Sequence, residues 1–239
     1  MNNSLQFVEE TRIGNVFLRS NTWKVHVLRR ALNDLKPLMA GLPTHYATTL
    51  DVGCGYGHSF AELAQRFNPH QIIGLDADPH ILERAGEAAH ASRVPVRLLA
   101  GHAAQIDCDS NSVDLLLCHQ TFHHIVEQEQ ALQEFFRVLR PGGVLLFAES
   151  TRRYIHSLLI RLFFRHPMDV QKTAEEYKTM IRSAGFELPD ERISTPYLWW
   201  SRPDLGFLEW IGLPVPQTRE ETLLNALAIK PALGSPKPA

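Results

Sequence analysis

LDVGCGYG, at residues 50–57, is the stretch of sequence that decides the fold class. It overlaps an apolar run at residues 47–52, which predicts a β-strand, and it precedes a helical pattern at residues 58–66. Glycine permits sharp turns and lets backbone N–H groups approach a ligand closely. Three glycines alternate over five residues here, which favours a ligand-binding loop over a plain turn between a strand and a helix.

Further apolar runs follow this loop, and helical patterns separate them. Strands that are apolar throughout are typical of parallel sheets, which are buried on both faces. The alternation of strands and helices implies right-handed crossovers and therefore a doubly wound α/β fold with a mostly parallel sheet. The further strands are predicted at residues 71–76, 94–100, 113–119 and 144–149, and the helices at 79–90 and 127–139, the last one ended by Pro141-Gly142-Gly143.

The segments outside this core predict helices and the completion of the sheet. We expect one or two helices at residues 18–39, helices at 154–164 and 173–184, and final strands at 186–194 and 223–230, which makes seven strands in all. We divide the chain into an N-terminal helical cap at residues 1–46, a ligand-binding core at 47–150, a lid that also completes the sheet at 151–232, and a flexible tail at 233–239.

Composition restricts the class of protein. The 239 residues carry 24 basic and 26 acidic side chains, so the near-neutral charge gives no electrostatic footprint for nucleic acid. We expect no signal peptide in the first twelve residues and no transmembrane segment, since no apolar stretch approaches about 18 residues. The three cysteines fit neither a zinc pattern nor a full disulfide framework, which favours the cytoplasm.

The spacing of the glycines indicates which ligand the loop binds. The dinucleotide fingerprint is Gly-x-Gly-x-x-Gly, whereas this loop follows the pattern Asp-x-Gly-x-Gly-x-Gly. Asp51 can accept a hydrogen bond from a ligand ammonium, and its charge disfavours a pyrophosphate. Asp76 ends the second predicted strand, where a carboxylate can accept hydrogen bonds from ribose hydroxyls.

These features resemble the class I S-adenosylmethionine-dependent methyltransferases. GLDADP at residues 74–79, VDLLLCHQTFHHI at 113–125 and ALQEFFRVLRPGGVLLFAE at 131–149 resemble, in order, further motifs of that family. The resemblance implies a Rossmann-like methyltransferase fold with a helical, aromatic lid, and S-adenosylmethionine as the cofactor, with S-adenosylhomocysteine as the product. The residues assigned to cofactor binding are Asp51, Gly53, Cys54, Gly55, Gly57, Asp76, Ala77, His102, Ala103 and His119.

One position departs from the family pattern. The family often has an aspartate after the glycine that follows the third strand, where it holds the adenine amino group. This chain has Gly101-His102-Ala103 there. His102 can hydrogen-bond to the base or stack on it, or it can be a surface loop residue, and the sequence leaves these alternatives open.

Candidate catalytic residues lie at the ends of the fourth and fifth strands. Ligands of parallel sheets bind beyond the carboxyl ends of the strands. His119 and His123 are candidates for the base that deprotonates a hydroxyl or phenol, since histidine titrates near neutral pH. Glu149 is a weaker candidate, and it can equally form a salt bridge with the arginines that follow it. The neighbouring histidines also raise the possibility of a metal, but without a matched carboxylate or cysteine set we expect no metal site.

The acceptor side is richer in aromatic residues than in charges. Residues 154–168 and 196–212 contain three of the four tryptophans, and an apolar lid predicts a small or medium, apolar or aromatic acceptor. The lid also carries positive charge that can hold an anionic or carrier-bound acceptor or face solvent, namely Arg152, Arg153, Arg161, Arg165 and His166. Four segments, CHQTFHHI, AESTRRYI, FRHPMDVQ and PYLWWSRPDLG, are similar to methyltransferases associated with bacterial aryl-polyene pigment biosynthesis. That similarity implies methylation of a phenolic ring or its carrier-bound precursor.

Two other classes of function remain open at this point. A catalytically silent module that binds the adenosyl cofactor and acts as a regulator is compatible with the same motifs. A nicotinamide-dependent oxidoreductase is disfavoured by Asp51 and by the glycine spacing. RNA methylation is disfavoured by the charge balance, so we expect no nucleic-acid partner, and we expect a monomer or a homodimer.

Overall fold

The computed structural model describes residues 11–214 and 219–232, and in this part of the chain it contains one seven-stranded sheet. The strand order is β3-β2-β1-β4-β5-β7-β6; β7 runs antiparallel to β5 and β6, and the other pairs are parallel. The doubly wound, mostly parallel fold predicted from the sequence is therefore confirmed. The strands are β1 (Thr48–Val52), β2 (Gln71–Asp76), β3 (Val96–Ala100), β4 (Val113–His119), β5 (Leu139–Ser150), β6 (Ile193–Ser194) and β7 (Leu223–Ile229).

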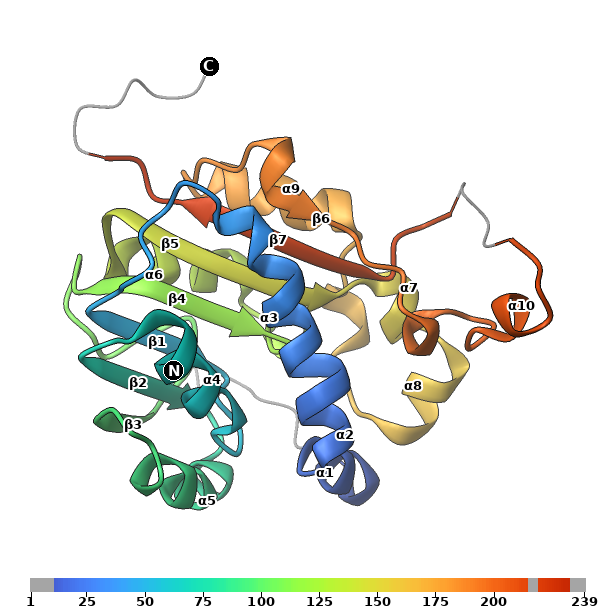
Figure 1. Ribbon diagram of the computed structural model, residues 1–239, viewed down its shortest axis with the longest axis horizontal. Helices are drawn as coiled ribbons and strands as arrows, with labels where there is room; N and C mark the ends of the chain where they lie inside the picture. The colour runs from blue at the N-terminus through green and yellow to red at the C-terminus, as the bar shows by residue number, and fades with distance from the viewer. Residues whose placement is uncertain (1–10, 215–218, 233–239) are drawn as a thin grey trace, which may run out of the picture.

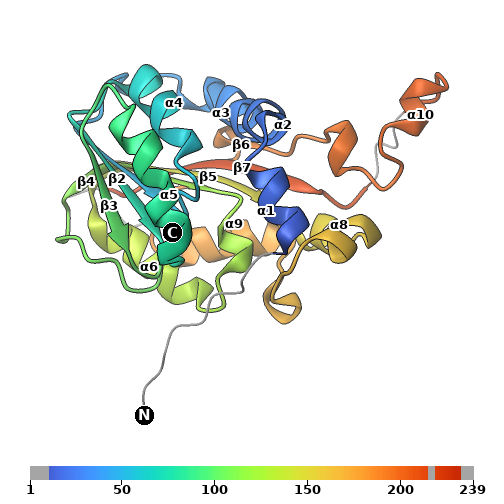
Figure 2. The same cartoon turned by 90° about the horizontal axis from the view of Figure 1, so that it is seen from below.

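Helices cover both faces of this sheet. Figure 2 shows α3 and α4 on one side of the strands and α6 and α9 on the other. In Figure 1, α3 crosses the sheet, and α1, α2, α7 and α8 gather beyond the ends of β4 and β5. The helices are α1 (Arg12–Leu18), α2 (Asn21–Trp23), α3 (Arg29–Leu35), α4 (His58–Phe67), α5 (Pro79–His90), α6 (Gln128–Val138), α7 (Arg152–Ile155), α8 (Leu158–Phe163), α9 (Ala174–Ser183) and α10 (Phe207–Trp210).

The central strands are buried on both faces, which explains their continuous apolar sequence. On β4, Leu115 and Leu117 pack in one core with α3, α4 and α5, whereas Leu116 and Cys118 pack in a second core with α6 and α9. All four side chains are fully buried. A strand between two cores has no polar face, so the run VDLLLCH is the pattern that a central parallel strand requires.

Two helix boundaries follow directly from local chemistry. Asp78 caps α5 by accepting hydrogen bonds from the backbone of His80 and Ile81, and Pro79 occupies the first turn. Thr173 and Glu176 form a reciprocal capping box at the start of α9, where the sequence predicted a helix.

Several predicted boundaries were wrong. The helical segment predicted at 18–39 starts later, at Asn21, because Ser20 caps it there; it then continues through a π-helical segment, Lys24–Leu28, into α3. The predicted helix at 154–164 divides between α7 and α8.

The predictions for the last strands also need correction. The predicted strand at 186–194 is reduced to Ile193–Ser194, because Pro189 lacks a backbone N–H and a short helical turn, Asp190–Arg192, follows it. Pro141-Gly142-Gly143 lies inside β5 rather than before it, next to a register shift opposite β4. The predicted tail at 233–239 lies outside the described residues. Within the described residues, every helix is too short or too polar to span a bilayer.

Candidate active site

The glycine loop lies at the carboxyl end of β1 and has a backbone that only glycine adopts readily. Gly53 has a φ of +71°, and its N–H and that of Cys54 both donate to the carbonyl of Leu75. A Cβ at Gly53 would lie 2.1 Å from the Oγ1 of Thr121, so the turn after β4 packs directly on this backbone. Gly55, with a φ of +53°, faces open space instead. The loop thus packs against Thr121 at Gly53, and it has free space beside it at Gly55.

Asp76 at the end of β2 holds this loop in place. Its Oδ2 accepts a hydrogen bond from the N–H of Gly55 at 2.8 Å, and its Oδ1 accepts one from the N–H of Asp78 at 3.0 Å. Burial raises the pKa of this carboxyl, and the backbone N–H groups of Asp78 and Gly55 oppose that rise. Each carboxylate oxygen retains a lone pair for a ligand hydroxyl.

A cavity of about 190 Å³, here called the donor cavity, opens beside this loop at the carboxyl ends of the parallel strands. This is where doubly wound sheets bind their ligands. The structure brings eight of the ten predicted cofactor-binding residues together in its wall: Gly53, Cys54, Gly55, Asp76, Ala77, His102, Ala103 and His119.

The other two predicted residues, Asp51 and Gly57, lie behind the wall. The Asp51 carboxylate is buried and accepts a hydrogen bond from the hydroxyl of Ser59. Burial raises the pKa of Asp51 to about 7, with the Ser59 hydrogen bond lowering it and the Asp76 charge raising it further. A Cβ at Gly57 would lie 2.6 Å from the ring of Phe60, so this glycine allows α4 to pack closely.

His102 lies in the donor cavity wall, so it is not only a surface loop residue. Its Nδ1 accepts a hydrogen bond from the N–H of Ala104 at 3.2 Å, and its Nε2 lies 3.8 Å from Oε2 of Glu127. These contacts fix the ring at the edge of the cavity, where the family often has an aspartate. Its contact with the adenine base stays a prediction.

His119 presents a buried nitrogen to the donor cavity. Its ring is 6% exposed and packs against Trp23 with 5.4 Å between ring centroids. Its Nε2 is buried without a hydrogen-bond partner among the described residues. Burial, together with the smaller effect of His123, lowers the pKa of His119 to about 3. A neutral ring with such a low proton affinity suits a ligand contact better than general base catalysis.

Glu149 is fully buried and lies in neither cavity wall, so it is not placed to act as a base. Its Oε1 accepts hydrogen bonds from the N–H groups of Thr121 and Phe122, both at 2.7 Å, and its Oε2 lies 2.6 Å from Nδ1 of His123. The alternative prediction, a salt bridge between Glu149 and the arginines that follow it, was wrong. The Glu149 carboxylate pairs with His123, and Arg152 instead lies 3.8 Å from Glu176.

A second cavity, of about 210 Å³ and here called the acceptor cavity, adjoins the first. His123 lies in its wall, whereas His119 lies only in the donor wall. Segments that are far apart in the sequence supply its aromatic lining: Phe17, Trp23, Tyr154, Phe164, Trp199 and Trp200. Both cavities share four side chains, namely Leu18, Trp23, Gln120 and His124.

Gln120 is a site residue that the sequence reasoning missed. It adopts a φ of +50°, which is uncommon for a residue other than glycine and concentrates at functional sites. Its Oε1 accepts a hydrogen bond from the hydroxyl of Ser150 at 2.6 Å. This contact ties the ends of β4 and β5 together where the cavities meet. The one sequence signal for Gln120 was its position directly after the end of the predicted fourth strand.

Comparison with known proteins identifies the core. Residues 50–147 match the family model described as a methyltransferase domain. A demethylmenaquinone methyltransferase of Deinococcus radiodurans is 32% identical over 49% of this chain and 49% of its own length. A tRNA 5-carboxymethoxyuridine methyltransferase of Escherichia coli is 34% identical over 55% of this chain and 52% of its own length. The chain therefore spans about half the length of these curated relatives.

Solved structures extend the similarity over most of the fold. A methyltransferase of Aquifex aeolicus that depends on S-adenosylmethionine superposes with a TM-score of 0.63 at 16% identity, covering 91% of this chain and 97% of that one. The [4+2]-cyclase SpnF superposes with a TM-score of 0.62 at 19% identity, covering 84% and 81%. At such identities the similarity shows the fold alone.

The donor cavity fits the cofactor that this family and fold imply. Gly55 faces open space, Asp76 offers carboxylate lone pairs to hydroxyls, and the Nε2 of His119 is a buried polar atom in need of a partner. A glycine-lined turn and an acidic strand end match the amino acid and ribose parts of S-adenosylmethionine in chemistry, and the His119 nitrogen offers a further polar contact. Residues 50–147 therefore match a methyltransferase domain, and the chain has the fold of a methyltransferase that depends on S-adenosylmethionine.

Proposed function

We propose that this protein transfers the methyl group of S-adenosylmethionine to a small or medium, apolar or aromatic acceptor. The observation that carries the proposal is the pair of adjoining cavities, one with polar loop ends and one with aromatic walls. Methyl transfer needs the donor and the acceptor in line and in contact. Two neighbouring cavities can hold them in this arrangement. The four shared side chains mark the boundary across which the methyl group passes.

On the donor side, the roles follow from the contacts. The bound donor supplies an electrophilic methyl group on a sulfonium, which is a good leaving group. Asp76 binds the ribose hydroxyls, the glycine loop admits the ligand close to its backbone, and His119 donates or accepts a hydrogen bond at Nε2 as a neutral ring. The proximity of Trp23 to His119 excludes water from this wall.

On the acceptor side, His123 is the residue placed to take a proton. It lies in the acceptor wall, and the Glu149 carboxylate 2.6 Å from its Nδ1 fixes the ring and leaves Nε2 for the acceptor. A carboxylate behind a histidine is the arrangement that orients imidazole bases. Deprotonation of a phenol raises its nucleophilicity at oxygen and at the ring carbons, which is consistent with the similarity to the aryl-polyene enzymes.

The size and lining of the acceptor cavity favour a small molecule or a carrier-bound group over a polynucleotide. One relative is named as a tRNA methyltransferase, so the acceptor of this protein has to be tested and cannot be inferred from its relatives. The cyclase neighbour likewise carries this fold under another activity. Fold alone therefore does not decide between turnover and a silent cofactor-binding module.

Thermal unfolding with S-adenosylmethionine, S-adenosylhomocysteine and NAD tests the donor site first. A ligand that binds only the folded state raises the melting temperature, so we expect a rise with both adenosyl compounds and none with NAD. Transfer of a labelled methyl group to a panel of phenols, carrier-bound aryl acids and tRNA then tests the acceptor. Donor binding with no transfer to any acceptor would support the silent module, and a rise with NAD alone would support an oxidoreductase.

A further inference from the structure

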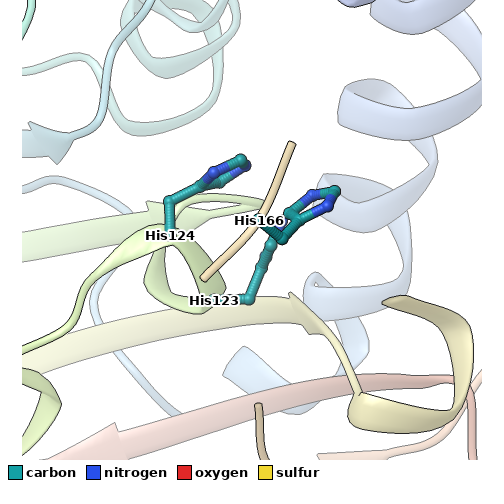
Figure 3. Close-up of side chains that lie close together, drawn as sticks. All are labelled: His123, His124 and His166. Carbon is teal, nitrogen blue, oxygen red and sulfur yellow. The ribbon is translucent and has the colours of Figure 1, made fainter. Parts of the chain in front are cut away.

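Three histidines form a compact cluster at the wall of the acceptor cavity. His123 and His124 lie on the short helical turn Phe122–His124 after β4, and His166 lies on the segment after α8. Figure 3 shows the three side chains close together beside that segment. Their ring centroids form a near-equilateral triangle, with separations of 4.4, 5.0 and 4.6 Å.

We propose that His123, His124 and His166 bind a divalent transition metal ion, with Zn²⁺ as the best match, at the wall of the acceptor cavity. One nitrogen of each ring lies within 4.8 Å of the others. With Zn–N bonds of about 2.0–2.1 Å, three nitrogens around one ion lie about 3.0–3.5 Å apart. The nitrogens therefore need to approach one another by no more than about 1.8 Å, which small side-chain rotations provide.

The surroundings of His123 are those of a metal ligand. Its Nδ1 lies 2.6 Å from Oε2 of the fully buried Glu149, which leaves Nε2 for the ion. Histidine ligands in metal sites almost always donate their other N–H to a carboxylate or carbonyl, which fixes the ring and raises its basicity. The buried carboxylate also supplies negative charge close to the site.

A buried glutamine holds the two parts of the cluster together. The Nε2 of Gln171 donates to the carbonyl of His123 and to the carbonyl of Pro167, both at 2.8 Å. Pro167 follows His166 directly, so one side chain connects the turn that carries two ligands to the segment that carries the third. The sequence favoured no metal site because no matched carboxylate or cysteine set accompanies the histidines, and the connection of the turn to His166 is long-range.

The donor set decides the class of metal. Three imidazoles without thiolate or carboxylate ligands suit Zn²⁺, Ni²⁺ or Cu²⁺ and disfavour Mg²⁺ and Ca²⁺. Three protein ligands plus one open position is the arrangement of catalytic zinc sites, and here all three rings line the acceptor cavity. An ion there would hold and polarise an anionic oxygen of the acceptor, replacing proton uptake by His123. That last role rests on the proposed function, whereas metal binding does not.

The test is titration of the untagged, chelator-treated protein with Zn²⁺ by calorimetry, and with Co²⁺ by visible absorption. We expect one saturable site per chain, with affinity lowered at least tenfold in His166→Ala and in His124→Ala, and about 10- to 100-fold in Glu149→Gln. His45 and His70 provide the matched control, because they form an exposed pair with ring centroids 5.0 Å apart. His70→Ala should bind Zn²⁺ like the unaltered protein.

No saturable binding to the unaltered protein, or equal binding by His166→Ala and His124→Ala, would overturn the metal site. His166→Ala keeps the test decisive even where Glu149→Gln fails to fold, because His166 lies outside the helices and strands. Thermal unfolding with S-adenosylmethionine separates the two proposals. A failed metal site leaves the donor-induced rise intact, and a failed donor site leaves stoichiometric Zn²⁺ binding intact.

Discussion

The donor cavity and the acceptor cavity are similar in size and share four side chains, yet the chain builds them differently. The donor wall comes mainly from loops at the carboxyl ends of β1, β2, β3 and β4, which adjoin in one sheet. The acceptor wall comes from the cap, the turn after β4, α7, α8 and the segment around Trp199. A site at one sheet edge inherits its geometry from the sheet, whereas a site between added segments depends on their packing.

This difference suggests a division of labour. Under the proposed function, the edge of the sheet positions the cofactor and the segments outside the core select the acceptor. Large side chains that remain exposed after β5, such as Leu158 at 84% and Trp210 at 81%, contrast with the fully buried core strands. Substitutions in the donor cavity should therefore change donor binding, and substitutions in the acceptor cavity should change methyl transfer without changing donor binding.

The largest effect is expected at Gly53. Gly53→Ala places a Cβ 2.1 Å from Thr121 at a φ of +71°, so we expect a loss of about 2–4 kcal/mol of unfolding free energy and of donor binding. Gly142→Ala is the control, because its φ of +77° is similar and no heavy atom lies within 4 Å. Urea unfolding should show a smaller loss there, about 1 kcal/mol. Equal losses would mean that backbone strain, not the contact with Thr121, restricts the loop.

Asp76 tests the donor side, and its carboxylate also accepts the backbone N–H groups of Gly55 and Asp78, so the melting temperature of the variant has to be measured beside its donor affinity. Asp76→Asn removes the charge from an acceptor of hydroxyl hydrogen bonds, a change of about 1.5–3 kcal/mol, so calorimetry should show S-adenosylmethionine binding about 10- to 100-fold more weakly. Asp34→Asn makes the same chemical change in an ion pair with Arg30, away from both cavities, and should bind normally. A dissociation constant within twofold of the original for Asp76→Asn would contradict the ribose assignment.

Thr22 offers a change confined to the acceptor side. Thr22 lies in α2 and lines only the acceptor cavity, so Thr22→Trp should displace the acceptor and lower methyl transfer by about 10- to 100-fold. Donor affinity should stay the same. Val25→Trp, at an exposed position in neither wall, is the control. A parallel loss of donor binding in Thr22→Trp would show that the two cavities are not separable.

The smallest effect is expected at His119. His119→Ala removes about one hydrogen bond to the donor, so affinity should fall about fivefold, for a loss near 1 kcal/mol, with turnover falling in proportion. Its pKa of about 3 leaves the ring neutral at working pH, which argues against a larger, base-related loss. His80→Ala, an exposed control, should change neither quantity. Unchanged donor affinity with lost turnover would instead return the base role to His119.

The same contrast explains what the sequence could predict. The donor side follows from local patterns, since Gly53, Asp76 and His119 each sit at a strand end and parallel strand ends converge. The acceptor side depends on pairings between distant segments. Nothing adjacent to Glu149 indicated that it would pair with His123 rather than with the arginines beside it. His166 was grouped with those arginines on a lid face, yet it is partly buried against two histidines.

The single turn of Gln120 to His124 has one more consequence, because it belongs to both walls and Glu149 fixes its backbone from below. A ligand in one cavity that shifts this turn therefore also changes the wall of the other cavity. Thermodynamic linkage makes such an influence reciprocal: the factor by which the donor changes acceptor affinity equals the factor by which the acceptor changes donor affinity. Under the proposed function, a change in how the donor contacts this turn would therefore change the affinity for the acceptor.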